Sequence, residues 1–298
     1  QCRDACGPVE TFSVLTNWGS VPAVKSARDL RKRILENLPE EIPFTGDVGI
    51  KLTDVKYGLD TLEDFVAQLT DRELGDLSRG EGGMGSALGI IGNAGAFGGI
   101  TQQLRDKGIP ALITADGPSG IRIKKHTTLL PCGTAIACAW NPALTEEMFE
   151  KVGQEAKHFG VDVLLSPGMN IHRNPLCGRN FEYYSEDGFL AGEICAAECK
   201  GIEEKGVRVV IKHFALNDCE QDRTGLGVWL NEQAAREIYL KAYQKAFEEV
   251  GANGVMMAYT RWGTMWAGAH SGLVNGILRT EWGANGLTIS DNVITTMV

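Results

Sequence analysis

A pattern of short apolar segments, each ending in polar or ionisable residues, recurs along the chain. The six segments of this kind are residues 111–115, 134–139, 161–167, 207–211, 254–258 and 286–290. Runs of this length indicate buried strands. Because helical stretches lie between them, the chain predicts alternating strands and helices with a parallel sheet.

Polar residues at the carboxyl ends of many strands favour a closed barrel over an open sheet. All strands of a (β/α) barrel end at one mouth, where side chains from different strands can meet. An open doubly wound sheet gathers its ligand at one switch point instead. The sequence therefore predicts an α/β fold of the (β/α)8 type. We expect the barrel to be incomplete, with its last strand missing, because the chain stops seven residues after Asp291.

The helical stretches and the first part of the chain suggest the domain organisation. Apolar spacing and capping residues predict helices at 61–69, 70–77, 145–159, 187–205 and 231–250, with a basic helix at 25–38 and an edge strand at 50–55. Residues 1–55 are interpreted as a lead-in or linker from a preceding domain, and residues 56–298 as the catalytic barrel domain.

Charge and cysteine usage exclude several classes of partner. The net charge of −9 argues against nucleic acid, which needs a clustered cationic surface, and no apolar run reaches membrane-spanning length. None of the eight cysteines forms a Cys-x-x-Cys pair or a zinc spacing, so no metal and no cofactor is expected. A reduced, cytoplasmic location is the simpler expectation, although Cys2 and Cys6 could pair.

Asp291 is the candidate nucleophile, because it ends an apolar strand that would hold it rigidly in the mouth of a barrel. Lys212 and His213 follow another strand and could reach the same ligand where that strand opens into a loop. Asp116, Arg179 and Lys212 offer the charged donors and acceptors that vicinal hydroxyl groups need.

Aromatic residues near these strand ends suit a pyranose, which has an apolar face and a polar rim. The candidates are Trp140, Tyr184, Trp229, Tyr259, Trp262 and Trp266. Each feature has a plainer interpretation when taken alone: Asp291 as a turn or helix cap, Arg179 with Glu182 as a salt bridge, and the tryptophans as packing. The sugar-binding interpretation rests on the strand ends being polar together.

Six ordered motifs carry a resemblance to a known family. They are Asp116–Arg122 (DGPSGIR), 168–175 (GMNIHRNP), 178–187 (GRNFEYYSED), 212–217 (KHFALN), 255–259 (VMMAY) and 286–291 (GLTISD). Their order and spacing from about residue 50 onward resemble glycoside hydrolase family 3. The chain is most similar to the bacterial β-glucosidases of the family in which the barrel follows the sandwich domain.

The resemblance implies a retaining, exo-acting hydrolase that removes a terminal β-D-glucosyl unit through a covalent glycosyl-enzyme. By position, Asp291 matches the nucleophile. The residues that match the sugar-binding positions are Asp116, Arg179, Lys212, His213, Met256 and Tyr259. The implied partner is a β-glucoside or oligosaccharide substrate.

The second carboxyl group of a retaining enzyme, expected about 5–5.5 Å from the nucleophile, has no match here. The resemblance implies that a separate sandwich domain, in another segment or another chain, supplies this acid/base. The histidine-bearing loop of the family's N-acetylglucosaminidases is absent after Lys212-His213. Glu220, Glu232 and Glu281 match no known acid. Asn292 stands where the family usually has tryptophan, so the aglycone preference is open. Thr260 stands where the family usually has asparagine, so the contacts around the nucleophile are open as well.

The residues are also compatible with three other functions. A sugar-binding pseudoenzyme would use the same pocket without an acid. A Schiff-base aldolase would use Lys212 as its amine. A phosphorylase would replace water by phosphate.

Overall fold

The computed structural model describes Lys32, Leu35 and residues 40–292. The chain divides into two units, Gln1–Pro43 and Phe44–Val298. In the first unit Lys32 and Leu35 are helical. The rest of the helix expected at 25–38 and the possible Cys2–Cys6 pair lie outside the described residues. The division falls before the boundary expected at residue 55, and that domain boundary stays a prediction.

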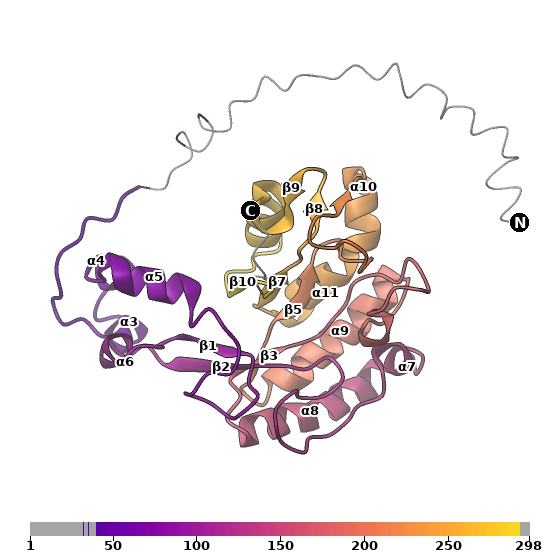
Figure 1. Ribbon diagram of the computed structural model, residues 1–298, viewed down its shortest axis with the longest axis horizontal. Coiled ribbons are helices and arrows are strands. Elements are labelled where there is room, and N and C mark those ends of the chain that lie inside the picture. The colour runs from indigo at the N-terminus through magenta and orange to yellow at the C-terminus, as the bar shows by residue number, and fades with distance from the viewer. Residues whose placement is uncertain (1–31, 33–34, 36–39, 293–298) are drawn as a thin grey trace, which may run out of the picture. The chain divides into compact units, whose positions relative to one another are not determined.

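The second unit is organised around two sheets with the strand orders β1-β2-β3-β4 and β5-β7-β10, and the short strands β6, β8 and β9 form a third (Figure 1). The strands of the first two sheets are β1 (Gly95–Gly98), β2 (Ala111–Asp116), β3 (Val163–Leu165), β4 (Arg208–Val209), β5 (Ile211–Phe214), β7 (Val255–Met257) and β10 (Thr288–Ser290). β2, β3 and β4 are parallel, as are β5, β7 and β10, whereas β1 is antiparallel to β2. Only Val210 separates β4 from β5, and an isolated parallel bridge joins Gly168 to Lys212, so the two sheets lie next to each other.

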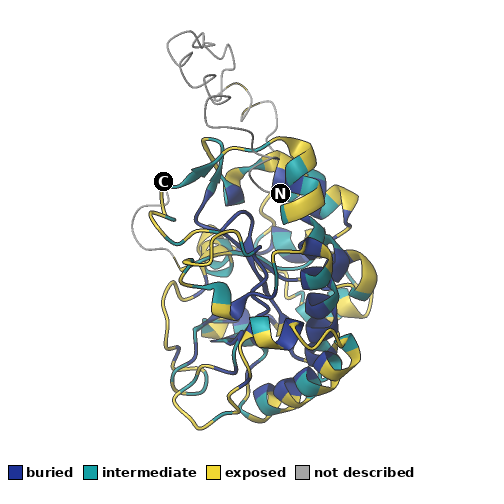
Figure 2. Ribbon diagram, turned by 90° about the vertical axis from the view of Figure 1, so that its right-hand side faces the viewer, coloured by how far each residue is buried: buried dark blue, intermediate teal, exposed yellow. Residues whose placement is uncertain are grey.

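Helices follow the parallel strands and cover them from outside. The larger ones are α8 (Pro142–His158), α9 (Gly188–Glu203) and α11 (Lys241–Val250), with the π-helix η5 (Gly272–Glu281) before β10. Figure 2 shows buried residues on the strands and the inward faces of the helices, and exposed residues on the outer faces. None of the helices in the described ranges is long and apolar enough to cross a membrane.

The remaining elements are short and lie before, between or after these repeats. They are α3 (Leu52–Lys56), α4 (Leu62–Ala67), α5 (Asp71–Arg79), α6 (Gln102–Asp106), α7 (Gly133–Ala137), η2 (Asn180–Glu182), β6 (Gly227–Val228), α10 (Glu232–Ala234), η3 (Ala235–Tyr239), β8 (Arg261–Trp262), β9 (Met265–Trp266) and η4 (Ala267–Ala269). Thr61 and Thr70 cap α4 and α5 as the sequence predicts.

Two predicted strands are wrong. Residues 134–139 fall on helix α7, because an alanine-rich apolar run this short fits a buried helix as well as a strand. Residues 50–55 fall on α3, where the Asp54 carboxylate accepts from the backbone N–H of Lys51 and closes a helical turn. Helix α8 begins at Pro142 and not at Thr145, because Asn141 caps it and proline suits its first turn.

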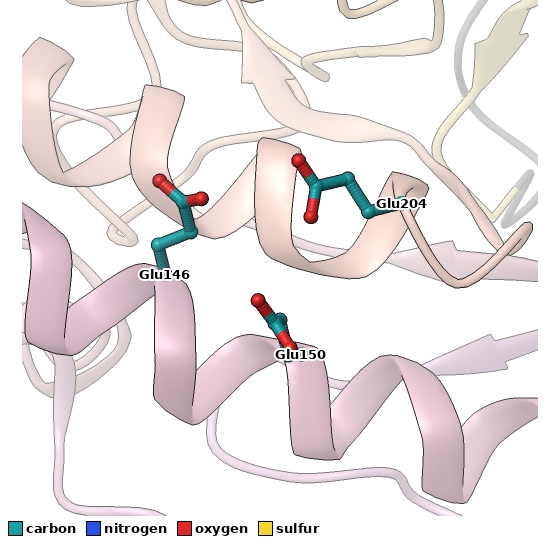
Figure 3. A group of neighbouring side chains, drawn as sticks. All are labelled: Glu146, Glu150 and Glu204. Carbon is teal, nitrogen blue, oxygen red and sulfur yellow. The ribbon is translucent and has the colours of Figure 1, made fainter.

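Helices α8 and α9 pack closely where their glycines meet. A Cβ on Gly201 would lie 2.5 Å from the carbonyl oxygen of Glu146, so only glycine permits this approach. Glu146, Glu150 and Glu204 gather beside the contact (Figure 3). Lys200 lies 2.7 Å from Glu146 and 3.9 Å from Glu204, and Lys205 lies 2.8 Å from Glu150. The cluster is therefore an ion-paired seam between two helices.

Candidate active site

A cavity of about 1530 Å³ opens at the carboxyl ends of the parallel strands. Six of the seven candidate residues line it: Asp116, Arg179, Lys212, His213, Met256 and Asp291. Asp116 ends β2, Lys212 and His213 lie on β5, Met256 lies on β7, and Asp291 follows β10. Arg179 comes from the loop after β3. The fold thus brings together residues that are far apart in the sequence.

Asp116 lies in the most strongly cationic part of the cavity. Its carboxylate forms an ion pair with the buried Lys212 and accepts from Arg122 Nη1 at 2.8 Å and from the N–H of Gly117 at 3.1 Å. Burial raises the pKa of Asp116. The charges of Lys212, Arg122 and Arg179 together lower it by more than burial raises it, so the pKa lies below its usual range. Asp116 is therefore held as a carboxylate that can accept hydrogen bonds.

His213 is held in the cavity as a neutral ring. Burial is the largest cause, followed by the charges of Arg179, Lys212 and Arg223, and together they hold the pKa of His213 well below its usual range. Its Nδ1 lies 3.0 Å from the hydroxyl of Tyr183. Its backbone is fixed on both sides, since Asn170 accepts from its N–H and Tyr243 donates to its carbonyl.

The carboxylate oxygens of Asp291 differ in their partners. Its Oδ1 accepts from the N–H of Asn292 at 2.7 Å. Its Oδ2 is buried, lies 3.8 Å from His213 Nε2 and has no hydrogen-bond partner among the described residues. A buried carboxylate oxygen without a hydrogen-bond partner costs free energy in folding, and such a cost is typical of an active site.

The pKa of Asp291 lies above its usual range although cations are near it. Burial is the largest cause and raises the pKa above its usual range. The N–H of Asn292 and then Arg223, Arg179 and Lys212 lower it, but by less in total. The cations therefore limit the cost of an ionised Asp291 without removing it.

Arg179 and Glu182 form a close ion pair on the cavity wall. The salt bridge expected from the plainer interpretation is present, and its two residues also line the cavity, whereas the sugar-binding role of Arg179 stays a prediction. His172 and Arg173 of the same loop do not line the cavity: His172 Nε2 lies 3.0 Å from the carbonyl of Asn180, and Arg173 lies over the ring of Tyr239.

Tyr259 is the one candidate that does not line the cavity. Its hydroxyl donates to the carbonyl oxygen of Asn292, directly after Asp291. The guanidinium of Arg223 lies 4.8 Å from the centre of its ring. Tyr259 therefore supports the segment that carries Asp291.

The cavity residues that were not assigned from the sequence include Arg122 and Arg223. Arg122 lies in a quoted motif and pairs with Asp116. Arg223 lies three residues after Glu220, and its Nη1 is 3.2 Å from Glu220 Oε2. Alternating opposite charges in a polar loop were the signal that could have found Arg223.

The six aromatic residues expected to bind the sugar are wrong, because none of their rings lines the cavity. Tyr184 is buried, Trp140 and Trp229 are exposed elsewhere, and Trp262 stacks on His270. The aromatic residues of the lining are Phe97 and Phe181. Proximity in sequence to a strand end did not decide where each ring points.

The cavity shows no metal-binding arrangement. Within the described ranges, the ion-paired cluster of Glu146, Glu150 and Glu204 is the only group of three or more His, Cys, Asp or Glu ligand atoms close enough to share an ion, and it lies outside the lining. The polar groups of the cavity instead suit a neutral ligand rich in hydroxyl groups.

A fully buried carboxyl group lies behind the cavity. Glu198 on α9 accepts from the hydroxyls of Ser166 and Tyr184. Burial raises the pKa of Glu198 to about 7, although both hydrogen bonds and the charge of Lys212 lower it. Glu198 therefore joins the end of β3 to the loop that carries Arg179.

We expect Glu198→Gln to flatten the pH dependence of stability. The usual carboxyl pKa of 4.5 is raised in the fold, so protonated Glu198 stabilises the protein below that pH. This contribution is lost as the pH rises through about 7, on the order of 3 kcal/mol in the free energy of unfolding. Glutamine cannot ionise and should not lose it. Urea unfolding at pH 5 and pH 8 measures the difference, and an equal fall in both proteins would contradict the buried-acid assignment.

Comparison with known proteins identifies the family. The model of the Glycosyl hydrolase family 3 N terminal domain matches residues 59–298. The chain belongs to glycoside hydrolase family 3. The resemblance found in the six motifs is thereby confirmed, and so is the α/β barrel-type fold.

Similar proteins are named β-glucosidases. The chain is 46% identical over 299 residues to a β-glucosidase of Ruminococcus albus, covering 98% of this chain and 31% of that protein. A β-glucosidase structure from Paenibacillus barengoltzii has a TM-score of 0.83 and 44% identity, with 89% of this chain and 28% of that chain covered. β-Glucosidase 3B of Thermotoga neapolitana, solved with α-D-glucose, has a TM-score of 0.72 and 38% identity, covering 78% and 34%. The chain spans about a third of the length of these relatives.

Proposed function

We propose that the protein carrying this chain is a retaining, exo-acting β-glucosidase that forms a covalent glycosyl-enzyme on Asp291. The observation that supports this most is that Asp291, whose buried Oδ2 has no partner in the described residues, lines a cavity together with several cations. The names of the similar proteins support the β-glucoside as substrate.

The proposed mechanism assigns each side chain a separate task. Asp116 accepts hydrogen bonds from sugar hydroxyls, while Lys212 and Arg179 donate to sugar oxygens. The Asp291 carboxylate attacks the anomeric carbon as the bond to the leaving oxygen breaks, which gives a glycosyl ester. Water then hydrolyses this ester from the opposite face, so two inversions give net retention. The surrounding cations stabilise the carboxylate that leaves in the second step.

The proton donor for the leaving group is proposed to come from another segment or another chain. Asp116 pairs with Lys212 and Glu182 pairs with Arg179, so neither carboxyl group is free to protonate a leaving group. Glu220 pairs with Arg223, and Glu232 and Glu281 pair with Arg236. Glu81, on the exposed glycine-rich loop, is the other carboxylate of the lining in the described ranges.

We expect Glu81→Gln to have little effect on the hydrolysis of an alkyl β-glucoside by the whole protein. An alkyl leaving group needs a proton, so loss of the true acid lowers its rate far more than that of an activated aryl glucoside. Steady-state kinetics on both substrates measure this ratio. A large loss confined to the alkyl substrate would place the acid on this chain. Normal turnover of an alkyl β-glucoside by the 298 residues alone would contradict the need for an external acid.

The stereochemistry of the product tests the proposed reaction class. A retaining enzyme releases β-glucose first, which then mutarotates, and proton NMR of the anomeric signals shows this order. Initial α-glucose would indicate inversion. Glucose 1-phosphate formed in phosphate buffer would indicate a phosphorylase, and glucose binding without product would indicate a pseudoenzyme. The ion pair of Lys212 with Asp116 argues against a Schiff-base lysine, which needs a free amine.

We also propose a reducing, cytoplasmic location. Six cysteines are free thiols in the described residues, three of them exposed: Cys132, Cys138 and Cys219. Exposed thiols persist in a reducing compartment. Fractionation of the native cells, followed by an assay for the protein, tests this, and recovery from the medium would contradict it.

A further inference from the structure

The neutral ring of His213 can carry its proton on either nitrogen, and the neighbouring groups determine which one. A neutral imidazole has one N–H and one bare nitrogen, and the bond made by one nitrogen fixes the role of the other. Here Nδ1 faces Tyr183 at 3.0 Å, and Nε2 faces the cavity 3.8 Å from Asp291 Oδ2. The position of the proton therefore decides what His213 presents to a ligand.

The orientation of the Asn217 amide is the first step. Its Nδ2 lies 3.0 Å from Glu220 Oε1, and Glu220 is an acceptor paired with Arg223. The reverse orientation would place an amide oxygen against a carboxylate oxygen, which repels. The observed orientation is favoured even though Asn217 Oδ1 then lacks a partner among the described residues. Glu220 thus fixes Nδ2 as the donor side.

The hydroxyl of Tyr183 is the second step. Asn217 Nδ2 also donates to the Tyr183 oxygen, at 3.4 Å. Burial raises the pKa of Tyr183 above its usual range, so the phenol keeps its proton. The acceptor found beside that hydroxyl is His213 Nδ1. Tyr183 therefore donates to Nδ1, which must be bare.

We propose that Tyr183, oriented by Asn217 and Glu220, is a positioning residue that keeps the neutral His213 protonated on Nε2. An N–H donor then points from Nε2 into the cavity beside Asp291. The gap of 3.8 Å to Asp291 Oδ2 is too long for a direct hydrogen bond. The N–H is thus left for a sugar oxygen. This last role rests on the proposed function, whereas the proton position does not.

The surroundings of His213 are rigid enough to hold this arrangement. Tyr183 and His213 meet edge to face with their ring centres 6.2 Å apart. Asn170 and Tyr243 fix the backbone of His213, and Glu198 binds Tyr184, the residue after Tyr183. Both ring planes are therefore set before any ligand binds.

Nuclear magnetic resonance of the histidine ring nitrogens tests the proposal directly. The whole protein carrying this chain is prepared with isotope-labelled histidine, and His213→Asn identifies the signal of His213. Long-range nitrogen–proton correlations distinguish the protonated nitrogen from the bare one. The proposal expects the proton on Nε2 in the natural protein. A proton on Nδ1 would overturn it, whether or not the protein hydrolyses glucosides.

Tyr183→Phe removes the hydroxyl and keeps the ring. We expect the His213 proton to distribute between both nitrogens, and kcat/KM to fall about fivefold to tenfold, as for one lost hydrogen bond. We also expect the pKa of His213 to rise, because a donor to its bare nitrogen is lost. The charged or titratable groups that face it are Arg179, Lys212, Arg223 and Asp291, which are unchanged. The acid limb of the kcat/KM profile therefore moves to higher pH.

Tyr243→Phe is the matched control, because its hydroxyl binds the backbone carbonyl of His213 and not the ring. We expect it to lower stability without moving the proton or the acid limb. An unchanged proton position in Tyr183→Phe would overturn the proposal, and so would equal shifts in both variants.

Discussion

Replacing Asp291 with alanine is expected to lower kcat of the whole protein on an aryl β-glucoside by at least about 10⁴-fold, as for other catalytic nucleophiles. The loss should be nearly as large with an activated leaving group, because an activated aglycone replaces the acid but not the nucleophile. Steady-state rates on both substrates measure it. A loss that depends on the leaving group would assign Asp291 to proton transfer instead.

The same substitution should not destabilise the protein. Burial raises the pKa of Asp291, so its ionised form opposes folding, and its Oδ2 leaves no partner behind in the described residues. We therefore expect an equal or higher melting temperature for Asp291→Ala. A marked loss of stability would mean that Asp291 is a structural residue.

Asp218→Asn provides a matched control. Burial raises the pKa of Asp218 to about 7, and its carboxylate accepts from the N–H of Ile171, outside the cavity lining. This variant changes a buried aspartate of the same chain without touching the cavity. We expect it to alter the pH dependence of stability and to leave the leaving-group dependence of the rate unchanged.

Replacing Lys212 with methionine is expected to lower kcat/KM by about 100- to 1000-fold, the range for removing one partner of a buried ion pair. Lys212 holds the Asp116 carboxylate, and its charge lowers the pKa of both Asp116 and Asp291. Without it, both acids gain protons at a higher pH. The acid limb of the profile should therefore move upward together with the loss of sugar binding.

Lys245→Met controls for the loss of a buried lysine. Lys245 is similarly buried, and its ion pairs are with Glu193 and Glu249 on the outer helices. We expect it to lower the melting temperature without changing kcat/KM. Equal kinetic losses in the two variants would mean that Lys212 acts through stability alone.

The strands were predictable because their apolar segments are short and bounded by polar residues. Five of the six expected segments carry the parallel strands that form the cavity. The segment 134–139 failed because its alanine-rich pattern has no period that separates helix from strand. The start of α8 was misplaced because the cap at Asn141 was overlooked in favour of Thr145.

The candidate site was predictable only at the level of which residues meet. Six of the seven assigned residues share the cavity because parallel strands end on one side. Their pKa values and partners were not predictable, since the burial of Asp291 and the contacts of Tyr183 and Glu198 depend on packing between distant segments. The aromatic rings failed for the same reason: sequence position placed them near strand ends, but packing turned them elsewhere.

Trapping of the glycosyl-enzyme tests the role of Asp291 most directly. The whole protein is incubated with a 2-deoxy-2-fluoro-β-glucoside bearing an activated leaving group, which slows the second step and needs little proton assistance. Mass spectrometry of the digested protein should find the fluoroglucosyl group on the peptide that contains Asp291, and none in Asp291→Ala. A label on another carboxylate, or rapid release of the aglycone with no label on any peptide, would contradict the account.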